Sequence, residues 1–395
     1  MINKEQNKFE MVAKTFFGLE PILEEEIKNL GAEDVRIGRR MVSFVGDLEV
    51  LYKANIFLRT ALRILKTVHS FTIKDQDDYY NKLIEIEWEV YLGLHHTFAI
   101  DSVVVNSEIF KNSLFTSQRA KDALVDRFRK KYHKRPLVNV ETPDVLINIH
   151  INGNRVNVAL DSSGVSLHRR GYRVMEGPAP INPVLAAALI KLSGWDPSTP
   201  FVDPMTGTGT MAIEAALIAR NIPPGLIRKE YCFQNWTDYN KKLYHKILEE
   251  VELNDFKPQI FANDISEESI EMARQNAFKA NITSFIRFSN KSFRDFKPRV
   301  KEGTVIINPP YGERMKEDKI NSLYKEMGDI LKEKYPGFKA WIISSNTNAM
   351  KNIGLKSSGK TKLFNGSLEC IFSAYDLFEG GYKEHKTELN ENKQG

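Results

Sequence analysis

Two short stretches of this chain carry residue types that could do chemistry. The first is NPPY, Asn308 to Tyr311, which follows the apolar run VII and precedes a charged segment. Proline cannot sit inside a central strand, because it lacks the N–H that the ladder requires. A strand therefore ends here with Asn308 at its carboxyl end, and in open α/β sheets ligands bind at that edge.

The second stretch is a glycine-rich loop, FVDPMTGTGTMA, which follows an apolar strand and opens a helix. It contains the spacing G-x-G-x-x-A over residues 207–212, in the context where this spacing predicts a ligand site. Glycine lets the turn bend tightly and lets a ligand approach the backbone. The residues of this loop that we expect to contact a ligand are Asp203, Met205, Thr206, Gly207, Thr208 and Gly209.

Charge separates the possible ligands of this loop. The carboxylate of Asp203 would repel a pyrophosphate, but it suits the ammonium of an amino-acid-bearing ligand, directly or through water. A later strand ends in Asp264, which could accept hydrogen bonds from two ribose hydroxyls or could cap the helix that begins near Ser266. A ribose with a positively charged amino-acid tail describes S-adenosylmethionine better than NAD.

A methyl donor gives the NPPY stretch a purpose. The Asn308 side-chain oxygen and the Pro309 carbonyl could accept hydrogen bonds from the exocyclic amine of a nucleobase, which is otherwise a poor nucleophile. Two acceptors would hold the nitrogen in line with the methyl and favour the developing positive charge. Pro310 stiffens the loop, and the Tyr311 ring could stack on an extruded base. We expect these four residues to be catalytic; the alternative is a plain strand-ending turn with a surface tyrosine.

The elements around these motifs change character near residue 183. Before it, the pattern predicts two small α+β units that end in a hairpin, VLINIHI and RVNVALD joined by NGN. The segment GYRVMEGPAPINP, with its glycines and three prolines, predicts a linker. After it, strands and helices alternate, which predicts a parallel sheet built from βαβ units.

Bulk composition is that of an ordinary globular protein of more than one domain, with 395 residues, 42% hydrophobic residues and a formal net charge of +5. No apolar run reaches the roughly 18–20 residues that a membrane span requires. The two cysteines, Cys232 and Cys370, provide neither a disulfide framework nor zinc spacing. We therefore expect a cytoplasmic protein without a metal site.

Two basic runs suggest contact with nucleic acid. One lies in the helix-like segment AKDALVDRFRKKYHKR, and the other is LHRRGYR. A lone charge run is usually a solvated helix face, but two runs flanking one strand pair make phosphate contact an equal alternative. The candidate RNA-binding residues are Arg129, Lys130, Lys131, Lys134, Arg135, Arg169 and Arg170.

Taken together, the motifs resemble those of the THUMP-domain RNA methyltransferases that make N2-methylguanine in bacterial 23S ribosomal RNA. That family's signature is followed by Asp203, Pro204, Met205, Thr206, Gly207, Thr208, Gly209, Ile213 and Glu214, with Thr206 where cysteine is frequent. LHRRGYR, PINPVLAAAL, NIPPGLIRKEYCFQNW and FFGLEPILEEEI are also similar to the family. The resemblance covers nearly the whole chain.

The resemblance implies an α/β fold: a Rossmann-like class I methyltransferase domain preceded by α+β ferredoxin-like and THUMP RNA-binding domains. The implied ranges are 1–69 ferredoxin-like, 70–165 THUMP, 166–182 linker, 183–381 methyltransferase and 382–395 disordered tail. Relatives often contact the adenine of the cofactor through an acidic residue. Here that position holds Ser292 unless the register differs, with Asp295 three residues further on, so we expect Ser292 and Phe293 at this contact and Ile265 among the cofactor-binding residues.

The implied activity is S-adenosylmethionine-dependent methylation of the N2 amine of a guanine in 23S ribosomal RNA, free or in a large-subunit precursor. Methylation of adenine N6 in RNA or DNA uses the same motif and stays open. A non-catalytic RNA-binding assembly factor is a third possibility. An NAD-dependent oxidoreductase is remote, because the acidic residue before the glycines disfavours a dinucleotide.

Overall fold

The computed structural model describes residues 8–175, 180–310, 317–366 and 368–379. These residues form two compact units. The N-terminal unit comprises Met1–Thr15, Glu20–Arg169 and Pro224–Val251, and the C-terminal unit comprises Phe16–Leu19, Arg170–Pro223 and Glu252–Gly395. Within the described part of the chain, no helix has the length and apolar character needed to cross a membrane.

The N-terminal unit is built on one mixed sheet of eight strands in the order β2-β3-β1-β4-β8-β7-β5-β6. Its strands are β1 (Phe9–Lys14), β2 (Glu33–Gly38), β3 (Met41–Gly46), β4 (Arg63–Thr72), β5 (Thr97–Val105), β6 (Leu137–Val138), β7 (Val145–Asn152) and β8 (Arg155–Asp161). Its helices are α1 (Glu20–Lys28), α2 (Leu48–Phe57), α3 (Gln76–Glu85), α4 (Ser113–Tyr132) and α7 (Lys241–Glu249).

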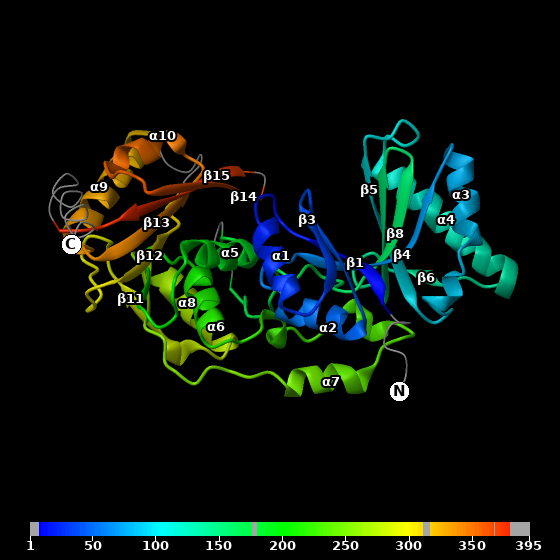
Figure 1. Cartoon of the computed structure of the whole chain (residues 1–395), viewed down its shortest axis with the longest axis horizontal. Coiled ribbons are helices and arrows are strands. Elements are labelled where there is room, and N and C mark those ends of the chain that lie inside the picture. The colour runs from blue at the N-terminus through cyan, green and yellow to red at the C-terminus, as the bar shows by residue number, and fades with distance from the viewer. Residues whose placement is uncertain (1–7, 176–179, 311–316, 367, 380–395) are drawn as a thin grey trace, which may run out of the picture. The chain divides into compact units, whose positions relative to one another are not determined.

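Strand β4 makes the two expected α+β regions continuous. It pairs with β1 on one side and with β8 on the other, both antiparallel. The register with β8 shifts between Thr67 and His69, which bends the sheet at this point. The helices α3 and α4 lie together beside the strands β4, β5 and β8 (Figure 1). The regions 1–69 and 70–165 therefore both contribute strands to one continuous sheet.

The segment Pro224–Val251 lies inside the range expected for the C-terminal domain, yet it packs with the N-terminal unit. Its aromatic side chains are buried in the core of that unit, where Phe233 stacks on Tyr52 with ring centroids 4.6 Å apart. The Arg228 guanidinium donates hydrogen bonds to the carbonyls of Ser163 and Val165, at 3.2 and 2.8 Å, and to others nearby. Burial of large apolar rings explains why this segment leaves its own sheet.

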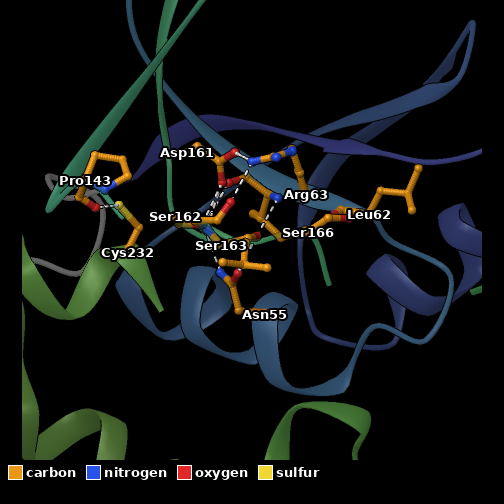
Figure 2. A network of polar contacts seen from close by, with 12 residues as sticks. Asn55, Leu62, Arg63, Pro143, Asp161, Ser162, Ser163, Ser166 and Cys232 are labelled. Atoms are coloured by element: carbon orange, nitrogen blue, oxygen red, sulfur yellow. Dashed lines mark hydrogen bonds and ion pairs between the residues drawn. The ribbon is translucent and has the colours of Figure 1, made fainter. Parts of the chain in front are cut away.

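A buried polar network joins α2, β4, β8 and this segment (Figure 2). The Asp161 carboxylate pairs with Arg63 and accepts the Ser163 N–H at 2.9 Å. The Asn55 amide donates to Ser162 Oγ at 2.8 Å and accepts from Ser163 Oγ at 2.7 Å. Burial raises the pKa of the nearby Cys232 thiol to about 12, so this thiol stays neutral and acts as a small buried side chain.

The C-terminal unit holds a seven-stranded sheet in the order β11-β10-β9-β12-β13-β15-β14. Its strands are β9 (Phe201–Asp203), β10 (Ile260–Asp264), β11 (Ile286–Asn290), β12 (Gly303–Ile307), β13 (Phe338–Ser344), β14 (Gly359–Asn365) and β15 (Leu368–Asp376). Its helices are α5 (Pro183–Ser193), α6 (Thr210–Ala219), α8 (Glu267–Lys279), α9 (Glu317–Lys334) and α10 (Thr347–Met350).

The first five strands of this sheet are parallel, and β15 and β14 close it in antiparallel orientation. In Figure 1, α5, α6 and α8 lie on one side of the sheet, and α9 and α10 lie on the other. The strand order reverses at β9, between β10 and β12. The carboxyl ends of these strands therefore border the crevice in which such sheets bind ligands.

Candidate functional site

A cavity of about 1030 Å³ lies at the carboxyl ends of the parallel strands in the C-terminal unit. Its walls come from the segments that follow β9, β10, β11 and β12, together with α9, the strand ends Asn365 of β14 and Leu368 of β15, and Pro180-Ile181. Eleven of the predicted site residues line it: Met205, Thr206, Gly207, Thr208, Asp264, Ile265, Ser292, Phe293, Asn308, Pro309 and Pro310. Tyr311, the remaining predicted catalytic residue, lies outside the described residues.

The glycine loop, residues 204–209, wraps one end of the cavity. Gly207 and Gly209 have φ angles of 52° and 81°, in the left-handed region that favours glycine. A Cβ on Gly209 would also lie 2.9 Å from the Ala273 Cβ on α8, so the loop could not sit this close with a side chain there. Gly209 does not face the cavity, whereas Gly207 and Thr208 do. The second glycine therefore serves the packing of the loop against α8.

Asp203 corrects part of one prediction from the sequence, which allowed contact with the ammonium of a ligand either directly or through water. Its side chain is 2% exposed and does not line the cavity, so in this conformation it cannot reach the ammonium of a ligand directly. The carboxylate instead accepts the Thr206 hydroxyl at 2.6 Å, and it is also hydrogen-bonded by the backbone of Met205 and Ala212. Asp203 organises the glycine loop from behind.

Asp264 lies on the cavity wall with both carboxylate oxygens held in place. One oxygen accepts the Gly207 N–H at 2.8 Å, and the other accepts the Ser266 N–H at 3.0 Å. The helix α8 is capped by Ser266, whose hydroxyl accepts the Ser269 N–H, so Asp264 is not the N-cap. Each carboxylate oxygen has a further lone pair, which fits the predicted contact with ribose hydroxyls.

The segment after β11 contributes Ser292, Phe293 and Arg294 to the cavity wall. Phe293 is 8% exposed and lines the cavity. The Ser292 hydroxyl donates to the Asp295 carboxylate at 2.6 Å, and Asp295 itself does not line the cavity. Ser292 therefore cannot use its proton toward a ligand while this hydrogen bond lasts, and it retains only acceptor capacity there.

Asn308 follows the last residue of β12 and carries an unusual acceptor. Its Oδ1 atom is buried and has no hydrogen-bond partner among the described residues. A buried acceptor without a donor costs roughly 1–3 kcal/mol, so such atoms are rare unless a ligand satisfies them. The neighbouring Pro309 is buried and Pro310 is exposed, and both line the cavity. The geometry therefore presents a preformed acceptor to a donor group.

Several cavity residues were not predicted from the sequence. The described lining is completed by Pro180, Ile181, Pro204, Thr210, Ser269, Arg294, Leu323, Glu326, Met327, Ile330, Asn365 and Leu368. The apolar spacing of α9 predicts that one face of it is buried, but not that this face borders a cavity. Arg294 and Glu326 form an ion pair of 2.9 Å on the wall, and their partnership joins two elements that lie far apart in sequence.

Six of the seven predicted RNA-binding residues lie at the surface of the N-terminal unit. They are Arg129, Lys130, Lys131, Lys134, Arg135 and Arg169, all exposed. Two of them have acidic neighbours: Arg129 lies 3.4 Å from Asp126, and Lys131 pairs with Glu89. Hydrogen bonds from Arg127 and Lys131 lower the pKa of Glu89 to about 2, so this carboxylate stays charged beside the basic helix.

Arg170 corrects a second prediction. Its side chain is 2% exposed and belongs to the C-terminal unit, where its Nε lies 3.4 Å from the buried Glu214 carboxylate. A guanidinium buried in this way has no surface to offer to RNA. The two adjacent arginines of LHRRGYR therefore differ in environment, which their identical chemistry in the sequence could not reveal.

Three family models match this chain. The RMKL-like methyltransferase domain matches residues 170–374, the RlmL ferredoxin-like domain matches residues 10–65 and the THUMP domain matches residues 74–161. The models therefore assign both predicted N-terminal domains and the predicted catalytic domain.

Curated relatives agree with these matches. A protein of Synechocystis sp. that is provisionally named an RNA methyltransferase is 36% identical over 91% of this chain and 95% of its own length. The ribosomal RNA large subunit methyltransferase K/L of Syntrophotalea carbinolica is 36% identical over 92% of this chain, but over only 53% of its own length. This chain thus spans about half of that relative.

Two solved structures share the fold over 95% of this chain, each with a TM-score of 0.85. One is SMU.472, provisionally described as a methyltransferase, in complex with SAH; it is 30% identical and is covered in full. The other comes from Listeria monocytogenes, was predicted to be an N6-adenine-specific DNA methylase, is 32% identical and is covered over 97% of its length.

The buried carboxylate behind the glycine loop makes stability depend on pH. Burial raises the pKa of Asp203 from 3.8 to about 7 against the lowering effect of the Thr206 hydrogen bond. The folded protein therefore holds the Asp203 proton more tightly than the unfolded chain does. Binding of this proton stabilises the folded state at low pH, and that contribution is lost as the pH rises from about 4 through about 7. Urea unfolding should show Asp203→Asn gaining stability relative to wild type between pH 5 and pH 8. A difference that does not change with pH would contradict this assignment.

Proposed function

The chain belongs to the RMKL-like methyltransferase family and is an S-adenosylmethionine-dependent RNA methyltransferase; from this premise we propose that it methylates the exocyclic N2 amine of a guanine in 23S ribosomal RNA. The target base is extruded and enters the cavity at the NPPY stretch. The substrate is ribosomal RNA, free or in a large-subunit precursor, and the enzyme acts in the cytoplasm.

The observation that supports this proposal most strongly is the unsatisfied acceptor of Asn308. A guanine N2 amine carries two N–H donors and no useful acceptor, so it complements a buried oxygen that lacks a donor. Binding would then satisfy Asn308 and fix the amine at the same time. The lone pair of the amine is delocalised into the ring, and an acceptor on its N–H draws electron density back to the nitrogen.

Pro309 extends the same argument through its backbone. Proline retains its carbonyl, which can accept a second hydrogen bond from the amine. The pyrrolidine rings of Pro309 and Pro310 restrict the loop in the free protein, so less conformational entropy is lost when the base binds. Two fixed acceptors favour the positive charge that develops on the nitrogen, and that nitrogen then loses its proton readily. No general base is required of the chain.

The other end of the cavity fits the cofactor. The Asp264 carboxylate is oriented by Gly207 and Ser266 and would hold the ribose hydroxyls, while the apolar Ile265 and Phe293 would enclose the adenine. The glycine loop would take the amino-acid tail next to the N-terminus of α6. When bound, S-adenosylmethionine supplies an electrophilic methyl group on a sulfonium. The cavity of about 1030 Å³ has room for a cofactor and a base together.

The choice of guanine N2 rests on kinship. The Syntrophotalea relative is named for the large ribosomal subunit, and this chain aligns with about half of it. The exposed basic residues on and just after α4 give the N-terminal unit a surface for phosphate. Adenine N6 is the second candidate, because Asn308 would accept its amine equally well and the Listeria neighbour was predicted to be an adenine methylase of DNA. The THUMP domain favours RNA over DNA.

The experiment that tests this proposal is transfer of labelled methyl from S-adenosylmethionine to total ribosomal RNA from cells that lack the protein, followed by nucleoside analysis. We expect the label in N2-methylguanosine. Label in N6-methyladenosine would keep the mechanism and overturn the target. Absence of label on naked RNA calls for the same assay on large-subunit precursors, and absence there as well would overturn the proposed activity.

The variant Asn308→Ala should lose turnover by about a hundredfold or more, because the amine loses the acceptor that stabilises its positive charge. Cofactor affinity should remain within about tenfold of wild type, since Asn308 is not one of the residues that we propose to hold the cofactor. Asn308→Asp keeps an acceptor oxygen and should retain measurable turnover. Asn352→Ala, in the same unit and away from the cavity lining, is the matched control. Full activity in Asn308→Ala would contradict the mechanism.

Reversing the charge of Lys130, Lys131 and Lys134 to glutamate should weaken RNA binding and flatten its salt dependence. Each lost phosphate contact removes about 0.7–0.9 from the slope of log affinity against log salt, so three contacts remove about two to three. Lys241, Lys242 and Lys246 on α7 of the same unit are also exposed, and their reversal is the control. Equal slopes for both triple variants would identify the α4 lysines as a solvated face only.

A further inference from the structure

Within the predicted linker, we call Arg170–Met175 the linker segment. It directly follows the Glu20–Arg169 part of the N-terminal unit and belongs to the C-terminal unit. Its first half is anchored to α6. The Tyr172 hydroxyl donates to the Glu214 carboxylate at 3.0 Å, and Arg170 lies 3.4 Å from the same oxygen. Glu214 is fully buried, so this anchor is an internal part of the fold. The linker is therefore fixed to the helix that the glycine loop opens.

The second half of the linker is held by Asn276 on α8, which is 1% exposed. The Asn276 Oδ1 accepts the N–H groups of Val174 and Met175 at 2.9 and 3.2 Å. The Asn276 Nδ2 donates to the Met175 carbonyl at 3.2 Å and to the Thr208 carbonyl at 3.1 Å. One amide thus uses both of its donors and both acceptor sites to join the linker to the glycine loop.

Arg173 makes an independent connection between the same parts. Its Nη2 donates to the Thr210 hydroxyl at 2.8 Å and to the Ile181 carbonyl at 3.0 Å. Thr210 and Ile181 both line the cavity, whereas Arg173 does not. The guanidinium thus lies behind the wall and adds positive charge next to the N-terminus of α6, where an anionic group is favoured.

We propose that the linker segment is a working part of the cofactor site, and that Asn276 and Arg173 are positioning residues that set the affinity for the cofactor through it. Thr208 and Thr210 line the cavity. Thr208 is held by Asn276, which also holds the linker, and Thr210 is held by Arg173, which belongs to the linker. Glycine residues impose few conformational restrictions, so the position of this loop depends on such hydrogen bonds in addition to those from Asp203 and Asp264. Displacement of the linker would release both holds at once.

This inference concerns the cofactor end of the cavity and does not depend on the target base. Its readout is binding of S-adenosylhomocysteine to the full chain without RNA, measured by titration calorimetry. A failure of the proposed guanine specificity would leave this binding unchanged, so the two hypotheses can fail separately.

The variant Asn276→Asp is nearly isosteric and tests the first connection. Its carboxylate can still accept from Val174 and Met175, but it faces the carbonyls of Met175 and Thr208 without a proton to donate. We expect affinity for S-adenosylhomocysteine to fall by about tenfold or more, the size that follows from one buried acceptor losing its donor. The matched control is Asn55→Asp in the N-terminal unit, where the asparagine is equally buried and also donates to two oxygens (Figure 2). This control should lose stability but keep its affinity for S-adenosylhomocysteine.

The variant Arg173→Met tests the linker itself without touching Asn276. We expect it to weaken cofactor binding as well. Its loss of binding free energy should not add to that of Asn276→Asp, because Arg173 belongs to the segment that Asn276 holds. The matched control is Arg220→Met at the far end of α6, where the half-buried guanidinium donates to the Phe256 carbonyl at 2.9 Å. Unfolding midpoints of all variants show whether each one is folded.

The outcomes separate the possibilities. Weakened binding in both test variants, with unchanged binding in both controls, supports the proposal. Weakened binding in Asn276→Asp alone would mean that only its bond to Thr208 matters, and the role of the linker would be overturned. Equal losses in test and control variants would reduce the effect to general destabilisation and would also overturn it.

Discussion

The reversal of strand order at β9 is the constraint on which the catalytic unit depends. Chain segments leave β9 and β12 at the same edge of the sheet but on diverging paths, and the space between them is the cavity. The glycine loop, Asp264 and Asn308 meet there because each directly follows, or ends, a parallel strand. Pairing of β9 with β10 and β12 therefore brings the Asp264 carboxylate and the Asn308 side chain to one edge.

Two buried polar groups at this edge, on Asp203 and Asn308, differ in whether other residues satisfy their hydrogen bonds. Asp203 is fully satisfied by the loop that it organises, and its raised pKa reflects burial rather than contact with a ligand. Asn308 is the opposite case, with a buried oxygen that has no donor among the described residues. A donor from a ligand would offset the cost of that oxygen. Under the proposed function, the oxygen is complementary to the reacting amine before the base binds.

The chain connects its RNA-binding and catalytic parts more than once. The segment Pro224–Val251 follows a helix of the C-terminal unit but buries its aromatic side chains in the N-terminal unit. The segment Phe16–Leu19 follows a strand of the N-terminal unit but belongs to the C-terminal unit. There the rings of Phe17 and Phe364 meet edge-on, with centroids 5.7 Å apart. The linker segment adds a third connection and ends against the glycine loop. Binding of RNA and of cofactor therefore involves elements that are covalently interleaved, although each unit keeps its own core.

The sequence by itself determined the strand-end motifs, because in a parallel sheet their order along the chain is enough to place Met205–Gly207, Asp264 and Asn308 at one edge. It also determined the family, through Asp203–Gly209 and NPPY. Tertiary structure alone decided what each side chain faces. Asp203 does not line the cavity, and Arg170 is buried on Glu214 while Arg169 is exposed. Tertiary structure also decided that one face of α9 and the strand ends Asn365 and Leu368 line the cavity, and that Asn276 holds the linker to the glycine loop. These facts depend on partners far along the chain, and no local pattern encodes them.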